Sequence, residues 1–267
     1  MANEFNPDPD HITDMRAVHF IQSYLCGDGM DDTAYEDAKT KATVLGRVLT
    51  KAGADINAHL VAKDGGSGEE KTSARTLLDL LVVSSLTDPE HHLAKDVHLG
   101  KLLLTFQELG AKFHDDALAP ELLVHACTTG DADLVAVAAA GGADANAAVD
   151  MDGHSGYRVI HYIMNFLFTE DPDAVPLPNT NEARREPFLA CVKALVDAGG
   201  DIKALTNVNG DMDVGLLDYT VLMLEQNERE VDKAIVEGLL ALGAVFTSED
   251  AEEAYHEAIG DGGGGGS

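Results

Sequence analysis

The chain of 267 residues contains no tryptophan, and aromatic residues of all kinds make up only 5% of it. Hydrophobic residues still account for 45%, so a core has to be built mainly from alanine, leucine, valine and isoleucine. This composition favours small, closely packed helices over a large β-sheet. The ordinary apolar fraction also argues against a disordered chain.

Basic residues are scarce as well. The chain has 18 Lys and Arg residues against 47 Asp and Glu residues, which gives a formal net charge of −29. A surface of this charge repels nucleic acid phosphates and anionic lipids, so neither nucleic acid nor a membrane is an expected partner. It favours a basic protein partner. The acidity is equally consistent with a role in solubility or with a salt-adapted host.

Cysteine is rare, with only Cys26, Cys127 and Cys191, and this odd count is not that of a disulfide framework. No apolar run approaches the roughly 20 residues that span a bilayer. Residues 1–10 are acidic and polar, unlike a secretory signal. These absences together predict a cytoplasmic protein.

Short glycine phrases recur along the chain, each after a segment rich in Leu, Ala and Val. They begin at Gly53, Gly110, Gly142, Gly199 and Gly243. A glycine just past a helix end adopts the left-handed conformation, and a following Asp or Asn can bond back to the local backbone. The preceding segments, 45–51, 102–109, 134–140, 192–198 and 235–242, space their apolar residues by three and four. Helices this short have to stack on one another to be stable.

A second phrase follows several of these turns. It reads Thr76-Leu77-Leu78-Asp79-Leu80, Leu216-Leu217-Asp218-Tyr219 and, after Ser155 and a short insertion, Ile160-His161-Tyr162. Residues 122–146 give the clearest copy of helix, tight turn, helix and glycine phrase. These phrases resemble the ankyrin-repeat family, with Asp where that family usually has His. The resemblance implies an all-α fold: a helical repeat solenoid with about five helix-turn-helix repeats and helical caps.

The spacing of the glycine phrases is irregular for that family. The gaps are 57, 32, 57 and 44 residues, against a family period of about 33. Insertions are therefore expected at 63–72, 87–98, 169–187 and 208–214. The predicted organisation is a capping helix and connection at 1–39 (helix 14–25), an array at 40–247, a capping helix at 248–260 begun by Ser248, and an artificial Gly/Ser linker at 261–267.

Two groups of residues have the side chains that metals prefer: His91, His92, Asp96 and His98 for zinc, and Asn209, Asp211 and Asp213 for calcium. The first matches no known ligand spacing. The second lacks the required glycine and closing glutamate, since Val214 and Thr220 stand there. Both groups are interpreted as parts of loops, and neither a metal nor a cofactor is expected.

Two further pairs of residues have reactive or charged side chains. Cys127 with His125 could form a nucleophile pair, but both fall on a helix that packs between repeats, where a small Cys is ordinary core. Arg184-Arg185 is the only basic doublet, and a local salt bridge is the expected role. No catalytic motif is present, so the chain is predicted not to be an enzyme.

The family resemblance implies a non-enzymatic protein–protein interaction module that binds its partner on a concave face. The residues expected to contact the partner lie on two turn tips: Met151, Asp152, His154, Tyr157 and Arg158 on the first, and Asn209, Asp211 and Met212 on the second. Exposed Met, Tyr and Arg side chains are good anchors. In the alternative, Tyr157 and Met151 pack internally.

The sequence leaves two further functions open. An acidic array could mimic nucleic acid and inhibit a basic toxin or nuclease, as an immunity protein would. An enzyme with its chemistry in the 169–187 or 87–98 insertion is the third possibility. In every case the chain by itself is expected to be a monomer.

Overall fold

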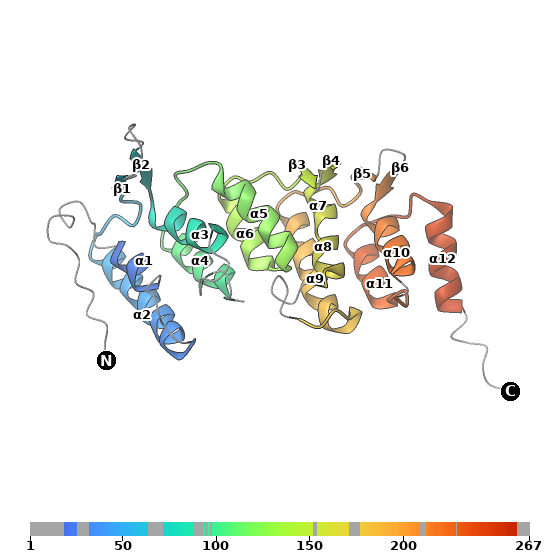
Figure 1. Cartoon of the computed structure of the whole chain (residues 1–267), viewed down its shortest axis with the longest axis horizontal. Coiled ribbons are helices and arrows are strands. Elements are labelled where there is room, and N and C mark those ends of the chain that lie inside the picture. Colours follow the sequence, from blue (N-terminus) through green and yellow to red (C-terminus); the bar gives the residue numbers. More distant parts are fainter. Residues whose placement is uncertain are drawn as a thin grey trace. The chain divides into compact units, whose positions relative to one another are not determined.

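The fold is described from a computed structural model, for residues 19–25, 32–63, 72–87, 93, 96, 98–151, 154–170, 177–208, 212–227 and 229–260. The chain forms two compact units, residues 1–119 and residues 120–267. Both units are mostly helical (Figure 1). No helix in the described ranges is long and apolar enough to cross a membrane.

The first unit has two helix pairs joined by a hairpin. Its elements are α1 (His19–Leu25), α2 (Asp32–Lys51), β1 (Leu60–Lys63), β2 (Thr72–Arg75), α3 (Leu77–Thr87) and α4 (Leu99–Glu108). Helix α1 packs against α2 and α3, and α2 packs against α4. The close approach of α2 and α4 depends on Gly46, where an added Cβ would lie 3.0 Å from the Phe106 ring.

The second unit continues with helices and two more hairpins. Its elements are α5 (Leu118–Thr129), which begins at the unit boundary, α6 (Ala132–Ala140), β3 (Ala148–Met151), β4 (His154–Arg158), α7 (Val159–Tyr162), α8 (Met164–Phe168), α9 (Asn181–Asp197), β5 (Leu205–Val208), β6 (Met212–Gly215), α10 (Leu216–Gln226), α11 (Lys233–Ala241) and α12 (Glu249–Gly260). Helix α9 packs against α6, α8 and α11, and α12 packs against α10.

The five predicted glycine turns are confirmed. All five glycines have positive φ: 85° at Gly53, 94° at Gly110, 95° at Gly142, 92° at Gly199 and 99° at Gly243. At three of these turns the following Asp accepts a hydrogen bond from the backbone N–H two residues on, at 3.0 Å for Asp55, 2.9 Å for Asp144 and 2.9 Å for Asp201. The same local chemistry therefore ends several helices.

The helix starts also follow from side chains in the sequence. Asp131 begins α6, because its carboxylate accepts hydrogen bonds from the backbone N–H groups of Asp133 and Leu134 at 2.9 and 3.1 Å. Asp232 has the same role at α11. The predicted Ser248 cap of α12 is present, with the Ala251 N–H donating to its Oγ at 3.5 Å.

The structure differs from the sequence prediction in three respects. Helix α2 has 20 residues and runs across the predicted boundary at 39–40, because Tyr35, Ala38 and Ala42 continue its buried stripe. Helix α9 begins at Asn181, within the predicted 169–187 insertion. The mostly helical structure is consistent with the all-α prediction, but the prediction did not include the short two-stranded hairpins that form in three of the long turns.

Candidate partner-binding surface

Two asparagines hold the turns of successive helix pairs together. In the first unit, the Asn57 side-chain amide donates to the Gly110 carbonyl at 2.8 Å, and its Oδ1 accepts from the Lys112 N–H at 2.7 Å. In the second unit, Asn146 donates to the Gly199 carbonyl at 2.9 Å and accepts from the Asp201 N–H at 2.7 Å. Each asparagine thus satisfies a donor and an acceptor of the next glycine turn.

Two buried aspartates add a second link between turns. Asp79, at the start of α3, accepts hydrogen bonds from the Thr76 hydroxyl at 2.9 Å and from the His114 N–H at 3.0 Å. Asp218, at the start of α10, accepts from the hydroxyl and the N–H of Thr247. Each aspartate connects the first helix of a pair to the following turn.

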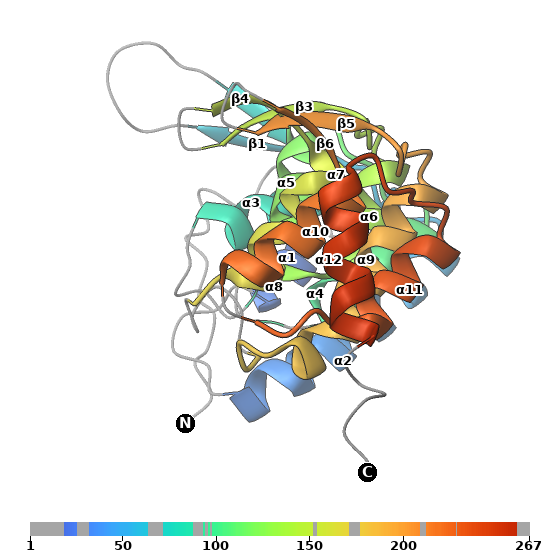
Figure 2. The same cartoon turned by 90° about the vertical axis from the view of Figure 1, so that its right-hand side faces the viewer.

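The two hairpins of the second unit lie next to each other, with β4 beside β5 (Figures 1 and 2). Strand β3 pairs with β4 through Ala148 opposite Arg158 and Val149 opposite Tyr157. Strand β5 pairs with β6 through Leu205 opposite Gly215. Asn146 hydrogen bonds link the glycine turn that precedes β3 to the glycine turn that precedes β5. The two hairpins therefore start from fixed positions.

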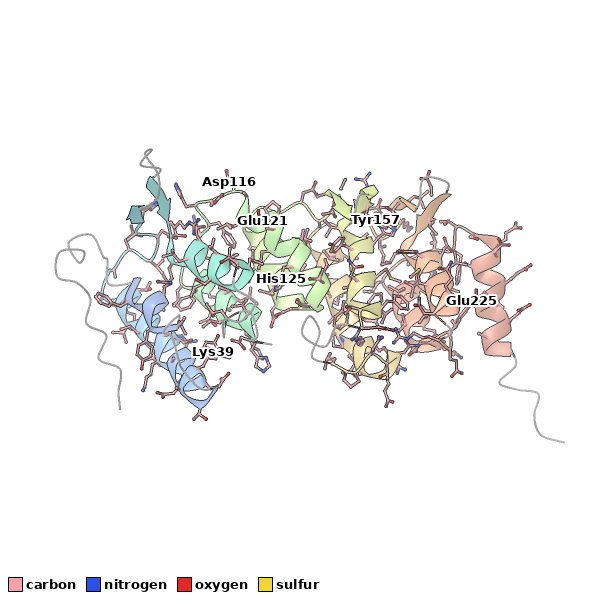
Figure 3. The ribbon with its side chains drawn as sticks, viewed as in Figure 1. Lys39, Asp116, Glu121, His125, Tyr157 and Glu225 are labelled. Carbon is pink, nitrogen blue, oxygen red and sulfur yellow. The ribbon has the colours of Figure 1, made fainter. Side chains whose placement is uncertain are left out.

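Tyr157 does not form an exposed anchor, so this part of the site prediction is wrong. Its side chain is 3% exposed, and it lies at the root of β4, where the strand meets α7 (Figure 3). Its side chain lies close to that of Tyr219 on α10. Burial, together with the Tyr157 contact, raises the pKa of Tyr219 to about 12. The tyrosine pair therefore belongs to the core that supports the hairpins, which is the alternative that the sequence left open.

Arg158 is exposed, as predicted for a contact residue. Its guanidinium donates to the carbonyl of Asn146 at 2.9 Å, which holds the side chain over the glycine turn. Met151, His154 and Met212 lie on strands β3, β4 and β6. Asp152, Asn209 and Asp211 lie outside the described residues.

Leu205 is a surface residue that the sequence prediction missed. It is 43% exposed, whereas its neighbour Thr206 is 1% exposed. Val214, which lies opposite Thr206 on β6, is 3% exposed. The apolar residue thus points outward and the polar residue inward, the reverse of the usual pattern. Asp213 on β6 is also exposed. A strand assignment for 205–208 would have revealed this inversion, since side chains alternate between faces.

His161 lies in α7 beneath the hairpins and is 1% exposed. Burial, opposed by the Val214 backbone and assisted by the charge of Arg158, lowers its pKa from the ordinary value of 6.5 to about 4. In the described part of the chain, neither ring nitrogen has a hydrogen-bond partner of good geometry. The imidazole is therefore neutral at pH 7 and behaves as a core side chain.

The candidate metal ligands are not brought together in the described part of the chain. Asp96 binds the Tyr35 hydroxyl at 2.9 Å and the Lys39 ammonium at 3.0 Å. His91 and His92 lie outside the described residues, and Asp213 is on β6. No group of three or more potential ligands occurs among the residues that the structure describes.

The candidate nucleophile is buried. Cys127 lies in the core of the second unit, and burial lowers the pKa of the nearby His125. The thiol of Cys127 contacts that of Cys191, and this hydrogen bond, together with burial, raises the pKa of Cys191. Both cysteines are free thiols. A thiol buried out of reach of a substrate is a poor nucleophile, so the pair is a feature of the core.

The basic doublet has two different roles. Arg185 forms the expected local salt bridge, with Asp232 at 2.7 Å. Arg184 is 1% exposed, and its guanidinium donates to the carbonyls of Phe166 and Thr169 at 2.8 and 2.7 Å. It thereby caps the carboxyl end of α8. No sequence signal separated these two neighbouring arginines.

Comparison with known proteins adds no relative. No protein-family model, no curated protein and no solved structure matches the chain.

Proposed function

We propose that this chain is an ankyrin-type repeat protein that binds a partner protein without catalysing a reaction. Support for the repeat assignment comes from the five glycine turns with positive φ and from the paired helices α5–α6 and α10–α11. The Asn57 and Asn146 hydrogen bonds add to it, because both reach a glycine carbonyl 53 residues further along the chain. A repeated contact at a repeated position is typical of solenoid proteins.

The proposed contact region is the hairpin surface, defined by the exposed residues Ala148, Arg158, Leu205 and Asp213. One observation carries the proposal: exposed Leu205 on β5 lies on the strand next to exposed Arg158 on β4. An apolar side chain beside a guanidinium is a suitable anchor for a protein partner. Buried Tyr157 holds the strands from below, so little conformational entropy is lost on binding.

The test is affinity capture from a lysate of the source organism, with the bound proteins identified and their affinities measured. Leu205→Ser and Arg158→Ala are expected to weaken binding by about tenfold or more each. Leu240→Ser is a matched control, because Leu240 is similarly exposed, at 39% against 43%, but lies on α11. A partner that binds all three variants as tightly as the unmodified chain would contradict the proposal.

The acidic-inhibitor function is the second candidate. The net charge of −29 favours it, whereas the described turn aspartates argue against it, because Asp55, Asp144 and Asp201 bond to their own backbones. Capture at low and high salt separates the two. A basic partner released by salt would support the inhibitor, and a salt-resistant partner that depends on Leu205 would support the hairpin surface.

A further inference from the structure

Helix α2 has an apolar outer face. Gly46 marks its inner side, since it faces Phe106 of α4. An α-helix turns about 100° per residue, so residues two positions away from Gly46 lie on the opposite side. These residues are Val44 and Val48, each 56% exposed. Two adjacent, strongly exposed valines on one face are apolar surface that lacks a neighbour in the described structure.

Cations surround these valines. The stretch 39–51 contains Lys39, Lys41, Arg47 and Lys51 and no acidic residue, in a chain with only 18 cations in all. Lys41 pairs with Asp37 and lies close to the hydroxyl of Tyr24, which is 48% exposed. Among the described residues, Arg47 and Lys51 form no ion pair. We call Tyr24, Lys41, Val44, Val48 and Lys51 the N-end face.

The last helices of the chain leave a different face open. Gly238 of α11 faces Leu189 of α9, where an added Cβ would lie 2.6 Å from the leucine side chain. Leu240, two residues on, is therefore on the opposite side of α11, and it is 39% exposed. Val245, in the turn that follows, is 43% exposed. Helix α12 packs against α10, and in the described part of the chain the side of α11 that carries Leu240 is exposed.

Carboxylates accompany these apolar residues. Helix α12 buries Ala251 and Tyr255 and presents a stripe of acidic residues on its other side, where a shallow hollow is lined by Glu249, Glu252, Glu253, His256 and Glu257. Only one ion pair involves these glutamates in the described structure, a 3.9 Å contact between Glu252 and His256. We call Leu240, Val245 and the four glutamates of this hollow the C-end face.

We propose that copies of this chain associate head to tail, with the N-end face of one copy seated on the C-end face of the next. Helix α2 would occupy the uncovered side of α11, placing Val44 and Val48 near Leu240. Lys41 and Lys51 would meet the α12 carboxylates. The two faces match in both respects: each has an apolar centre, and their rims have opposite charge.

The charges select this arrangement over a symmetric dimer. Pairing two N-end faces would bring Lys41 and Lys51 of both copies together, and pairing two C-end faces would bring two rows of glutamates together. Because the matching faces differ, each copy can bind one neighbour through its N-end face and another through its C-end face, and the assembly can extend. The monomer expected from the sequence is then the state at low concentration.

The test is sedimentation velocity of the full chain near 0.1 M salt, where the Debye length of about 10 Å limits the repulsion between acidic copies. The concentrations run from about 1 µM to about 1 mM, since a contact made by one helix is in the weak class. The unmodified chain is expected to form larger species as concentration rises. Lys41→Glu, Arg47→Glu and Lys51→Glu together should weaken association by about tenfold or more, because the two lysines of the N-end face and the exposed Arg47 next to Val48 would then repel the α12 carboxylates.

A reciprocal variant makes the test specific. Glu252→Lys, Glu253→Lys and Glu257→Lys together should weaken association by a similar factor. A mixture of the two triple variants should associate again, because the unmodified C-end face of the first variant matches the unmodified N-end face of the second, and the two reversed faces also have opposite charge. All changed side chains are on exposed surface, and circular dichroism checks that both variants fold.

An unmodified chain that stays monomeric throughout, or a mixture that fails to associate, overturns the proposal. Leu205→Ser is expected to leave association unchanged, so failure here is distinct from failure of the partner-binding function.

Discussion

The side-chain amide of Asn146 donates a hydrogen bond to the carbonyl of Gly199 at 2.9 Å, across 53 residues of chain. Asn57 and Gly110 form the same bond at 2.8 Å and the same sequence separation. In each case the asparagine oxygen accepts a second bond from the residue two positions after the glycine. One amide therefore fixes the distance between two turns. In the second unit, this also sets the distance between the two hairpins that follow those turns.

Asn146→Ala should lower the free energy of unfolding of the second unit by about 1–3 kcal/mol, because a backbone carbonyl and an N–H lose their partner. Chemical denaturation followed by circular dichroism measures the change. Asn227→Ala is the control: within the described part of the chain, the Asn227 side chain makes a local bond to the Met223 carbonyl at 2.8 Å and none to a distant turn, so the substitution should change stability by less than about 0.5 kcal/mol. Equal effects of the two substitutions would contradict the role assigned to Asn146.

Arg184 and Arg185 are adjacent in sequence but should respond very differently to truncation. Arg184→Ala removes a buried guanidinium from the carbonyls that end α8 and is expected to destabilise by about 2–4 kcal/mol. Arg185→Ala breaks a partly exposed ion pair with Asp232 and should cost about 1 kcal/mol or less. Thermal denaturation of the two variants at pH 7 gives the comparison. A larger loss for Arg185→Ala would mean that α8 is held by other contacts.

Gly130 should be the least replaceable of the turn glycines. It has a φ of 70°, and an added Cβ would lie 2.6 Å from the Phe166 ring. Gly142 has a φ of 95°, but its Cβ would meet nothing within 4 Å. Gly142→Ala is expected to cost about 1–2 kcal/mol from backbone strain alone, and Gly130→Ala should exceed it because the ring must move. The unfolding free energies of the two variants test this order.

The folded state should lose stability in mild acid through His161. Its pKa is about 4 in the folded chain and about 6.5 when unfolded. Above pH 6.5 the imidazole is neutral in both states. As pH falls from 6.5 towards 4, the unfolded chain takes up the proton first. Protonation then stabilises the unfolded chain, and the free energy of unfolding falls by a total of roughly 3 kcal/mol. His161→Leu should flatten the dependence of unfolding free energy on pH between pH 7 and pH 5. An unchanged slope would show that His161 does not titrate in this way.

The turns and helix ends could be predicted because they depend on local chemistry. Gly53 and Gly142 follow the apolar helices α2 and α6. Asp131 precedes α6 and Ser248 precedes α12. Residues next to each helix end therefore decide its conformation. The first half of α2 was missed because its buried stripe is made of Tyr35, Ala38 and Ala42. Small residues give a weak apolar periodicity, although their spacing is helical.

The candidate surface was harder to predict because burial is decided by distant contacts. Tyr157 is buried in a core that includes Tyr219 of α10, 62 residues further along the chain. Leu205 is exposed because β5 turns Thr206 inward. Neither outcome follows from the residue type, since tyrosine commonly occurs in binding surfaces and leucine in cores.

The most direct test of the partner-binding proposal is amide hydrogen exchange of the full chain with and without a captured partner. Binding on the hairpin surface should slow exchange in β4 and β5 most strongly, and Leu205→Ser should abolish that protection while Leu240→Ser leaves it in place. Protection confined to α12, or to helices that carry no hairpin, would contradict the proposal and place the partner elsewhere on the molecule.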